Sequence, residues 1–148
     1  HSISYKMITD YWKDTGTPED IINANKTILE NIVPEFKGEK DSTVLIQGNV
    51  SVGNETYISN QVKINGPVII GNGCKISGDA IIGPNTSIGN ECNILGGTIQ
   101  DSIIMNNCKI GKNINLRNSI ISSNSTIVQN NIKNEQVFLV GEGTKVSF

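Results

Sequence analysis

Residues 64–94 read INGPVIIGNGCKISGDAIIGPNTSIGNECNI, and every sixth residue of this run is an isoleucine. The step of six also extends back toward the N-terminus, and the complete series consists of Ile46, Val52, Ile58, Ile64, Ile70, Ile76, Ile82, Ile88 and Ile94. This period fits neither an amphipathic helix, which repeats every ~3.6 residues, nor an isolated alternating strand. It therefore predicts a repeat architecture.

A second series of small or branched residues follows the aliphatic series at a distance of four positions. Its members are Val50, Thr56, Val62, Val68, Cys74, Ala80, Thr86, Cys92 and Thr98. Each hexad thus describes one short strand and one corner, and three hexads close a triangular coil of about 18 residues, with successive coils stacked about 4.8 Å apart. The sequence predicts a parallel β-helix whose aliphatic side chains point to the axis.

Asparagines are frequent beside the glycines that follow the aliphatic residues. Corners of such a coil need residues that tolerate positive φ, and asparagine is the best occupant of that region after glycine. The asparagines expected to play this role are Asn54, Asn60, Asn72, Asn85 and Asn90.

The rhythm changes after Ile94. Gln100 stands where an aliphatic residue is expected, and the frame resumes at Ile104, Ile110 and Leu116 before it shifts again to Ile121 and Ile127. These shifts predict longer corners at residues 96–102 and 118–120, from which loops bulge. Residues 46–132 then form about five coils. Residues 137–140 are expected to form a last strand that covers the open end.

Composition excludes several classes of partner. The chain has 148 residues, a formal net charge of -2 and a single arginine, Arg117. Because its lysines are not clustered, the chain shows no electrostatic footprint for nucleic acid or for an anionic membrane. No apolar run approaches the ~20 residues of a membrane span and no signal peptide precedes the repeats, so we expect a cytoplasmic protein.

Three cysteines, Cys74, Cys92 and Cys108, all fall in the inward small-residue series. Cys74 and Cys92 are 18 residues apart, so they are expected to stack in adjacent coils. A free cysteine behaves as a small buried hydrophobe. An odd number of cysteines without paired spacing predicts neither a disulfide framework nor a zinc site.

The segment before the repeats has a different pattern. Thr17 is a suitable N-cap, Pro18 suits the first helical turn, and Asp20 stands where a capping box places an acid. These signals predict a helix from Pro18 to about Ile32. Its apolar stripe, formed by Ile21, Ala24, Ile28, Leu29 and Ile32, is expected to pack on the first coil or on a domain outside this chain.

Residues 11–25, YWKDTGTPEDIINAN, resemble the end of the catalytic domain in long-form glucose-1-phosphate thymidylyltransferases. Three later pieces are also similar to that family, namely NGPVIIG at 65–71, DSIIM at 101–105 and LVGE at 139–142. These sugar nucleotidyltransferases carry a β-helix at their C-terminus. The resemblance implies a mainly β fold, a left-handed parallel β-helix (hexapeptide repeat) of about five coils preceded by one α-helix.

In that family the aspartate of the Trp-x-Asp-Thr-Gly motif binds the catalytic magnesium ion, which implies Asp14 as a metal ligand here. The family reaction is attack of a sugar-1-phosphate oxygen on the α-phosphorus of a nucleoside triphosphate, with release of diphosphate. Mg²⁺ would neutralise the phosphates during this displacement. The resemblance thus implies Mg²⁺ for the full-length enzyme and no cofactor for this fragment.

The family's glycine-rich nucleotide loop, its lysine and its second metal-binding aspartate have no counterpart in this sequence. One carboxylate without these groups cannot position the reactants for phosphoryl transfer. We therefore expect a C-terminal fragment that is inactive alone and serves assembly or regulation. Residues 1–36 would be the tail of the catalytic domain with its linking helix, and residues 37–148 the β-helix domain.

Two alternatives remain at this point. Hexapeptide acyltransferases that use acetyl-CoA share this repeat, but they generally need a histidine base, and the only histidine is His1 at the terminus. The chain could also be a structural or regulatory module that senses a metabolite at the irregular corners. Resemblance further implies a homotrimer, for which Tyr57, Val128 and Phe138 are candidate contacts.

Overall fold

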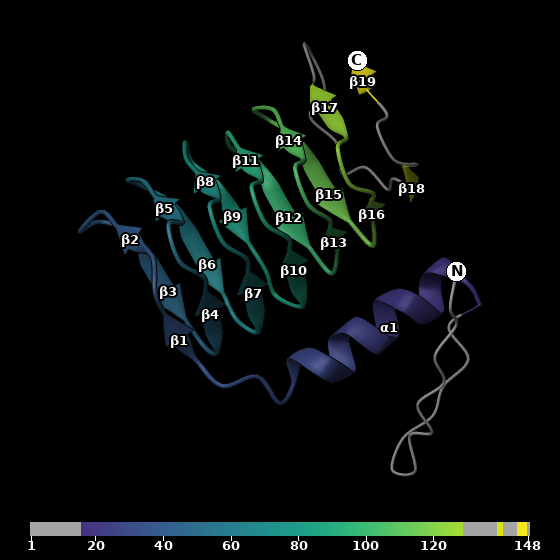
Figure 1. Cartoon of the computed structure of the whole chain (residues 1–148), viewed down its shortest axis with the longest axis horizontal. Coiled ribbons are helices and arrows are strands. Elements are labelled where there is room, and N and C mark those ends of the chain that lie inside the picture. Colours follow the sequence, from purple (N-terminus) through teal and green to yellow (C-terminus); the bar gives the residue numbers. More distant parts are fainter. Residues whose placement is uncertain (1–15, 129–138, 141–144, 148) are drawn as a thin grey trace.

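The computed structural model describes residues 16–128, 139–140 and 145–147. One helix, α1 (Pro18–Leu29), is followed by a β-solenoid whose short strands form three parallel sheets (Figure 1). None of the helices in these residues is long and apolar enough to cross a membrane.

The three sheets are named A, B and C after the order in which the chain first visits them. Sheet A contains β1 (Glu35–Phe36), β4 (Val50–Val52), β7 (Val68–Ile70), β10 (Thr86–Ile88), β13 (Ile103–Ile104), β16 (Ile120–Ile121) and β18 (Leu139–Val140). Sheet B contains β2 (Glu39–Lys40), β5 (Tyr57–Ile58), β8 (Lys75–Ile76), β11 (Asn93–Ile94), β14 (Lys109–Ile110), β17 (Thr126–Val128) and β19 (Lys145–Ser147). Sheet C contains β3 (Leu45–Gln47), β6 (Lys63–Asn65), β9 (Ile81–Ile82), β12 (Thr98–Gln100) and β15 (Asn115–Arg117).

Each turn of the solenoid visits the sheets in the order C, A, B. The 5 strands of sheet C mark about five complete turns, and further strands of sheets A and B extend the stack at both ends. In the early turns the paired residues are 18 apart, as in Ile46↔Ile64 and Ile58↔Ile76. The predicted mainly β fold, with about five coils and one preceding helix, is confirmed.

The predicted inward series forms the core. Eight of its nine aliphatic members are buried, and Ile46, in the first complete turn, is half-buried and packs against them. The second series is buried as well, except for the half-buried Thr98. Burial of one aliphatic and one small side chain on each face of each turn is the main source of stability, because the strands are too short to be stable alone.

The later turns differ from the prediction. Ile99, not Gln100, is the inward residue, with no exposed surface, so the step from Ile94 is five residues and the step to Ile104 is again five. The corners at 96–102 and 118–120 are therefore shorter than the regular ones, and the predicted longer, bulging corners are wrong. At Asp101 and Asn118, φ is 48° and 49°, so a left-handed residue turns the chain from sheet C to sheet A.

The role predicted for the asparagines is correct only for Asn85, whose φ is 55°. At the corner between sheets A and B the left-handed residue comes one position after the asparagine, as at Glu55 and Glu91. The asparagines of this corner stack on one another in successive turns. The side-chain oxygen of each accepts a hydrogen bond from the backbone N–H of the asparagine in the preceding turn, at 2.8 Å. The donor–acceptor pairs are Asn54–Asn72, Asn72–Asn90 and Asn90–Asn106.

This amide stack explains why glycine precedes these asparagines. A Cβ on Gly71 would meet the Asn90 side-chain oxygen and would lie 2.8 Å from the carbonyl carbon of Gly89. No side chain fits between turns held this closely. The equivalent position in a later turn, where serine replaces the next asparagine, is Met105.

The cysteines lie inside the solenoid, as predicted, and all three are free. Each thiol donates to a backbone carbonyl of the next turn, with the sulfur of Cys74 and that of Cys92 both 3.0 Å from the oxygen. Hydrogen bonds with Cys108 and Cys74, together with burial, raise the pKa of the central Cys92. Hydrogen bonding with Cys92 lowers the pKa of Cys74 and of Cys108.

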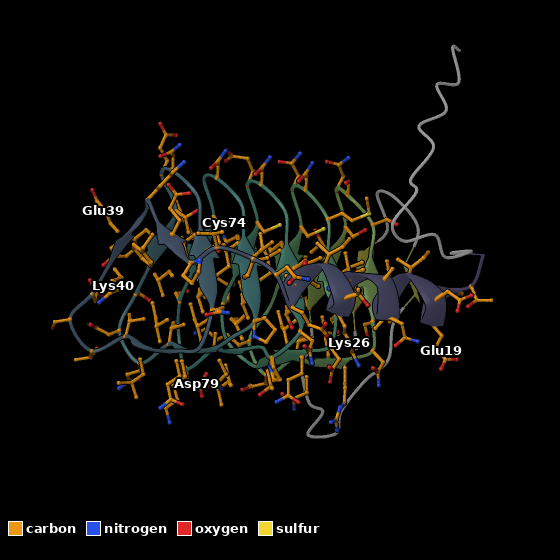
Figure 2. The ribbon with its side chains drawn as sticks, turned by 90° about the horizontal axis from the view of Figure 1, so that it is seen from below. Glu19, Lys26, Glu39, Lys40, Cys74 and Asp79 are labelled. Carbon is orange, nitrogen blue, oxygen red and sulfur yellow. The ribbon has the colours of Figure 1, made fainter. Side chains whose placement is uncertain are left out.

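Helix α1 begins as predicted, because the Thr17 hydroxyl accepts the backbone N–H of Asp20 at 3.1 Å. It ends at Leu29, three residues before the predicted end. The predicted packing face is only partly right: Ile22 and Leu29 are buried, whereas Ile21 and Ile28 are exposed. The helix contacts β10 in the middle of sheet A and runs lengthwise along the solenoid, so it does not simply cover the first coil (Figure 2).

The ends of the stack are protected in two ways. At the N-terminal end, β1 and β2 have two residues each, and the charged Glu39 and Lys40 are exposed (Figure 2). Short, charged edge strands discourage pairing with another chain. At the other end, β18 and β19 pair with β16 and β17, which agrees with the expected last strand. Residues 129–138, and thus Phe138, lie outside the described residues.

Candidate functional site at the junction of helix and solenoid

The helix meets the solenoid at the corners between sheets C and A, where charged side chains converge on Asp101. The Lys26 Nζ atom, from the helix, lies 3.3 Å from one carboxylate oxygen of Asp101. The Arg117 Nε atom, from β15, lies 3.6 Å from the other. The Asn85 side chain donates to the first oxygen at 3.0 Å. Both oxygens of this carboxylate are thus engaged, and its side chain is only 13% exposed.

Local geometry explains how these residues meet. Asp101 and Asn118 directly follow the paired residues Gln100 and Arg117, so they occupy the same corner in successive turns. Asn85 occupies the corner of the preceding turn, and all three have left-handed φ values. Asn and Asp tolerate this conformation better than other non-glycine residues. The shortened corners therefore stack polar side chains in a row that faces the helix.

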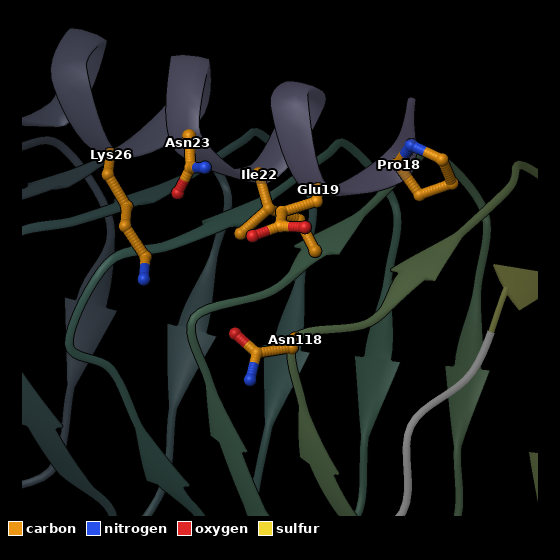
Figure 3. A pocket seen from close by; sticks show the side chains of 6 residues that line it. All are labelled: Pro18, Glu19, Ile22, Asn23, Lys26 and Asn118. Carbon is orange, nitrogen blue, oxygen red and sulfur yellow. The ribbon is translucent and has the colours of Figure 1, made fainter. Parts of the chain in front are cut away.

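A cleft of about 370 Å³ opens beside this cluster. It is lined by Pro18, Glu19, Ile22, Asn23 and Lys26 of the helix and by Asn118 of the solenoid (Figure 3). In Figure 3 the side chains of Asn23 and Lys26 point from the helix toward the solenoid, and Asn118 lies on the opposite wall. The cleft is open and its walls are mixed in polarity, unlike the mostly apolar pockets that enclose small molecules.

Further along the helix, a polar contact replaces apolar packing. The hydroxyl of Ser87, on β10, donates to the side-chain oxygen of Asn25 at 2.6 Å. The Asn25 amide nitrogen is buried and has no hydrogen-bond partner in the described part of the chain. Together with the Lys26–Asp101 pair, this contact fixes the helix at one position along sheet A.

The charged groups at the centre of the junction neutralise one another. Within residues 16–128, 139–140 and 145–147, no group of three or more His, Cys, Asp or Glu side chains could hold a metal ion. Asp101 is the most buried carboxylate at the junction, and it is neutralised by two cations and a hydrogen bond. The arrangement can fix the orientation of the helix.

The candidate residues from the sequence are distributed as follows. Asp14 and His1 lie outside the described residues. Tyr57 is 42% exposed on β5, and Val128 is half-buried on β17, in the first and the last complete turn of sheet B. These two candidate contacts for self-association thus belong to one sheet but not to one continuous patch.

Sequence reasoning identified the irregular corners but not the residues that act there. It missed Asp101 as the centre of a charge cluster, and Lys26, Asn25 and Ser87 as contacts of the helix. One signal was available: once Ile99 is placed inward, Asp101 and Asn118 come into line, both one residue after the end of a sheet C strand. The partners from the helix could not be identified, because no repeat relates the helix to the solenoid.

Comparison with known proteins gives matches to sugar nucleotidyltransferases. The glucose-1-phosphate thymidylyltransferase of Streptomyces antibioticus is 36% identical over 58 residues, which cover 39% of this chain and 16% of that protein. The bifunctional protein GlmU of Methanococcus vannielii is 40% identical over 45 residues, 30% of this chain and 11% of that protein. The low-salt glycan biosynthesis nucleotidyltransferase Agl11 of Haloferax volcanii is 31% identical over 52 residues, 35% of this chain and 15% of that protein.

Each alignment thus spans less than a fifth of the relative's length. A hexapeptide transferase family protein from Anaplasma phagocytophilum aligns with a TM-score of 0.33 and 19% identity over 74% of this chain and 69% of that one, too weak a likeness to bear on function. The family model described as the GMPPB C-terminal domain matches residues 64–147, which is more than half of the sequence. The chain therefore belongs to the GMPPB C-terminal domain family, the β-helix domain of sugar nucleotidyltransferases of the glucose-1-phosphate thymidylyltransferase kind.

Proposed function

We propose that this chain serves as the C-terminal assembly or regulatory domain of a sugar-1-phosphate nucleotidyltransferase and is inactive by itself. In the full-length enzyme, a phosphate oxygen of glucose-1-phosphate attacks the α-phosphorus of dTTP, the bond to the β-phosphate breaks, and dTDP-glucose and diphosphate form. The observation that carries the proposal is the family match over residues 64–147, supported by the thymidylyltransferase relative.

The proposal assigns chemistry and assembly to different parts of the protein. Residues 1–36 would be the end of the catalytic domain with its linking helix, and residues 37–148 the β-helix domain. Asp14 would be a ligand of Mg²⁺ in the full-length enzyme. Carboxylates suit this ion, and the described residues contain no group of three or more His, Cys, Asp or Glu side chains that could hold it.

Two further parts of the proposal concern assembly and location. We propose that the solenoid self-associates, as a homotrimer, in a cytoplasmic enzyme without nucleic-acid or membrane partners. Tyr57 and Val128 on sheet B, with Phe138, remain the candidate contacts. Light scattering would test the trimer, and a monomer at high concentration would contradict it.

The decisive assay is release of diphosphate from dTTP and glucose-1-phosphate in the presence of Mg²⁺. We expect no turnover by this chain and clear turnover by the longer protein encoded with its upstream sequence. In the longer protein, Asp14→Asn should abolish turnover without changing the solenoid's circular dichroism spectrum. Turnover by the chain alone, or an inactive longer protein, would overturn the proposal.

The same preparation tests the acyltransferase alternative. The chain is incubated with acetyl-CoA and an aminosugar phosphate, and free coenzyme A thiol is measured. No thiol release is expected, because the only histidine is His1, at the terminus. Clear release would favour the acyltransferase instead.

A further inference from the structure

Helix α1 has a second apolar surface that the solenoid does not cover. Ile22 and Leu29 face sheet A and are 5% and 0% exposed. Ile21 and Ile28 are 39% and 66% exposed, and Val33, just beyond the helix, is 80% exposed. We name Ile21, Ile28 and Val33 the outer surface.

Ile21 and Ile28 lie on the same side of the helix, and Val33 follows just beyond its end. Ile21 and Ile28 are seven residues apart, which is about two helical turns, or roughly 10 Å along the axis. The described residues contain seven exposed large hydrophobic residues, and three of them form this surface. Isolated exposed apolar residues need no explanation, but two on the same side of one helix, with a third just beyond its end, indicate a binding surface.

The placement of the helix supports this interpretation. The Lys26–Asp101 ion pair and the Asn25–Ser87 hydrogen bond hold the inner side of the helix on the solenoid. The helix lies outside the stack, and Figure 1 shows it along one flank with no other element of the described chain beyond it. The outer surface is therefore held in a fixed position, and no element of the described residues covers it.

We propose that the outer surface docks the domain that precedes this chain in the longer protein, so that the helix is clamped between that domain and sheet A. This inference rests on the proposed function. The matched family is a C-terminal domain, and the alignments cover at most 16% of the relatives cited above. Ile21 lies near the N-terminal end of the helix, toward the side from which a preceding domain would join.

Tethering favours this occupant over a second copy of the chain. A stable interface between separate molecules usually takes about 20–30 residues a side, and the outer surface has three apolar side chains. A domain joined directly to the helix needs fewer contacts, because its effective concentration at the surface is of the order of millimolar. Docking there would fix the orientation of the catalytic domain relative to the solenoid.

A cysteine-labelling experiment tests the proposal. Ile28→Cys places a reactive thiol in the outer surface, and Lys63→Cys, on exposed β6 of sheet C, is the matched control. The chain's own cysteines are buried, so each variant has one accessible thiol in the described part of the chain. In the chain alone both positions should react at similar rates. In the longer protein we expect the labelling rate of Cys at position 28 to fall at least about tenfold, and the labelling rate at position 63 to stay the same.

Equal labelling of the two positions in the longer protein would overturn the proposal. Protection of position 28 in the chain alone that increases with protein concentration would also overturn it, because a second copy would then be the occupant. The diphosphate assay on the same longer protein separates the two claims. Turnover with an unprotected position 28 rejects only the docking, whereas protection without turnover rejects only the proposed function.

Discussion

The early and late turns of the solenoid have the same core but different lengths. After β1, which pairs with β4 at a separation of 16, paired residues up to Asn93 on β11 are 18 apart, whereas later pairs such as Ile88↔Ile104 and Ile99↔Leu116 are 16 and 17 apart. The strands stay parallel and in register in both regions. The repeat length is thus a property of the corners, and the stacking of inward side chains is what the two regions share.

The corners differ because different devices turn the chain. Two early corners between sheets C and A contain a Gly–Pro pair with a cis peptide bond, Gly66–Pro67 and Gly83–Pro84, whereas the later ones lack this pair and turn at the left-handed residues Asp101 and Asn118. A shorter corner also brings polar side chains under the helix. The irregular part of the repeat is therefore where the solenoid is attached to another element.

The largest expected change in stability comes from core substitutions, which test whether the two regions are equally well packed. Ile82, in an early turn, and Ile110, in a late one, are both 0% exposed. Ile82→Ala and Ile110→Ala should each lower the free energy of unfolding by about 2–5 kcal/mol, because each leaves a cavity. Denaturant titration followed by circular dichroism measures this, with Leu45→Ala, 57% exposed, as the control. A loss at Ile110 no larger than at Leu45 would show that the late turns are loosely packed.

A glycine substitution tests the amide stack of the early turns. Gly71→Ala should cost about 1–3 kcal/mol, because the new Cβ overlaps the Asn90 side chain and backbone of the next turn. In an Asn90→Ala background part of this cost should disappear, which a double-mutant cycle measures. Gly111→Ala, where the nearest atom is 3.2 Å away, is the matched control in a late turn. Strictly additive effects of the Gly71 and Asn90 changes would refute the close contact.

A substitution at Asp101 tests the charge cluster of the late corners. Asp101→Ala should destabilise the chain by about 1–2 kcal/mol, because Lys26, Arg117 and Asn85 lose their shared acceptor while remaining partly hydrated. Asp101→Asn keeps the left-handed preference and an acceptor, so it should cost less. No loss for Asp101→Asn, measured by denaturant unfolding, would mean that the carboxylate charge contributes nothing.

The smallest effect concerns the first turn. The hydroxyl of Tyr57 donates to Asp41, and this hydrogen bond is the main reason why the pKa of Tyr57 is raised above its ordinary value. The folded chain holds this proton more tightly than the unfolded chain, so the contribution to stability is present below pH ~10 and is lost as the pH rises through the folded pKa. The difference in tyrosinate absorbance between the parent and Tyr57→Phe isolates this titration. Asp41→Asn should move it to lower pH, and an unchanged titration would contradict the assignment.

Much of the fold could be predicted from one chemical pattern. The step of six can be found without knowledge of tertiary structure, because the spacing of the isoleucines alone shows which residues are buried in each turn. The start of the helix at Thr17 follows from local capping chemistry. The shortened corners were misjudged because the isoleucine beside Gln100 was not tested as the inward residue. The handedness came from resemblance and not from spacing.

The junction could not be predicted, since its contacts join residues distant in sequence. The Asn25–Ser87 hydrogen bond spans 62 positions, and neither residue has an unusual local context. The packing face of the helix was partly misassigned for a related reason. The helix has two adjacent apolar stripes, and the sequence does not show which of them meets sheet A.

All of these conclusions require that one column of small residues, including the three cysteines, points into the solenoid. Thiol labelling of the native chain tests this directly and needs no mutation. Cys74, Cys92 and Cys108 are at most 1% exposed, so we predict that none reacts in the native state and that all three react after unfolding in denaturant. Prompt labelling of even one of them in the native chain would contradict the inward column.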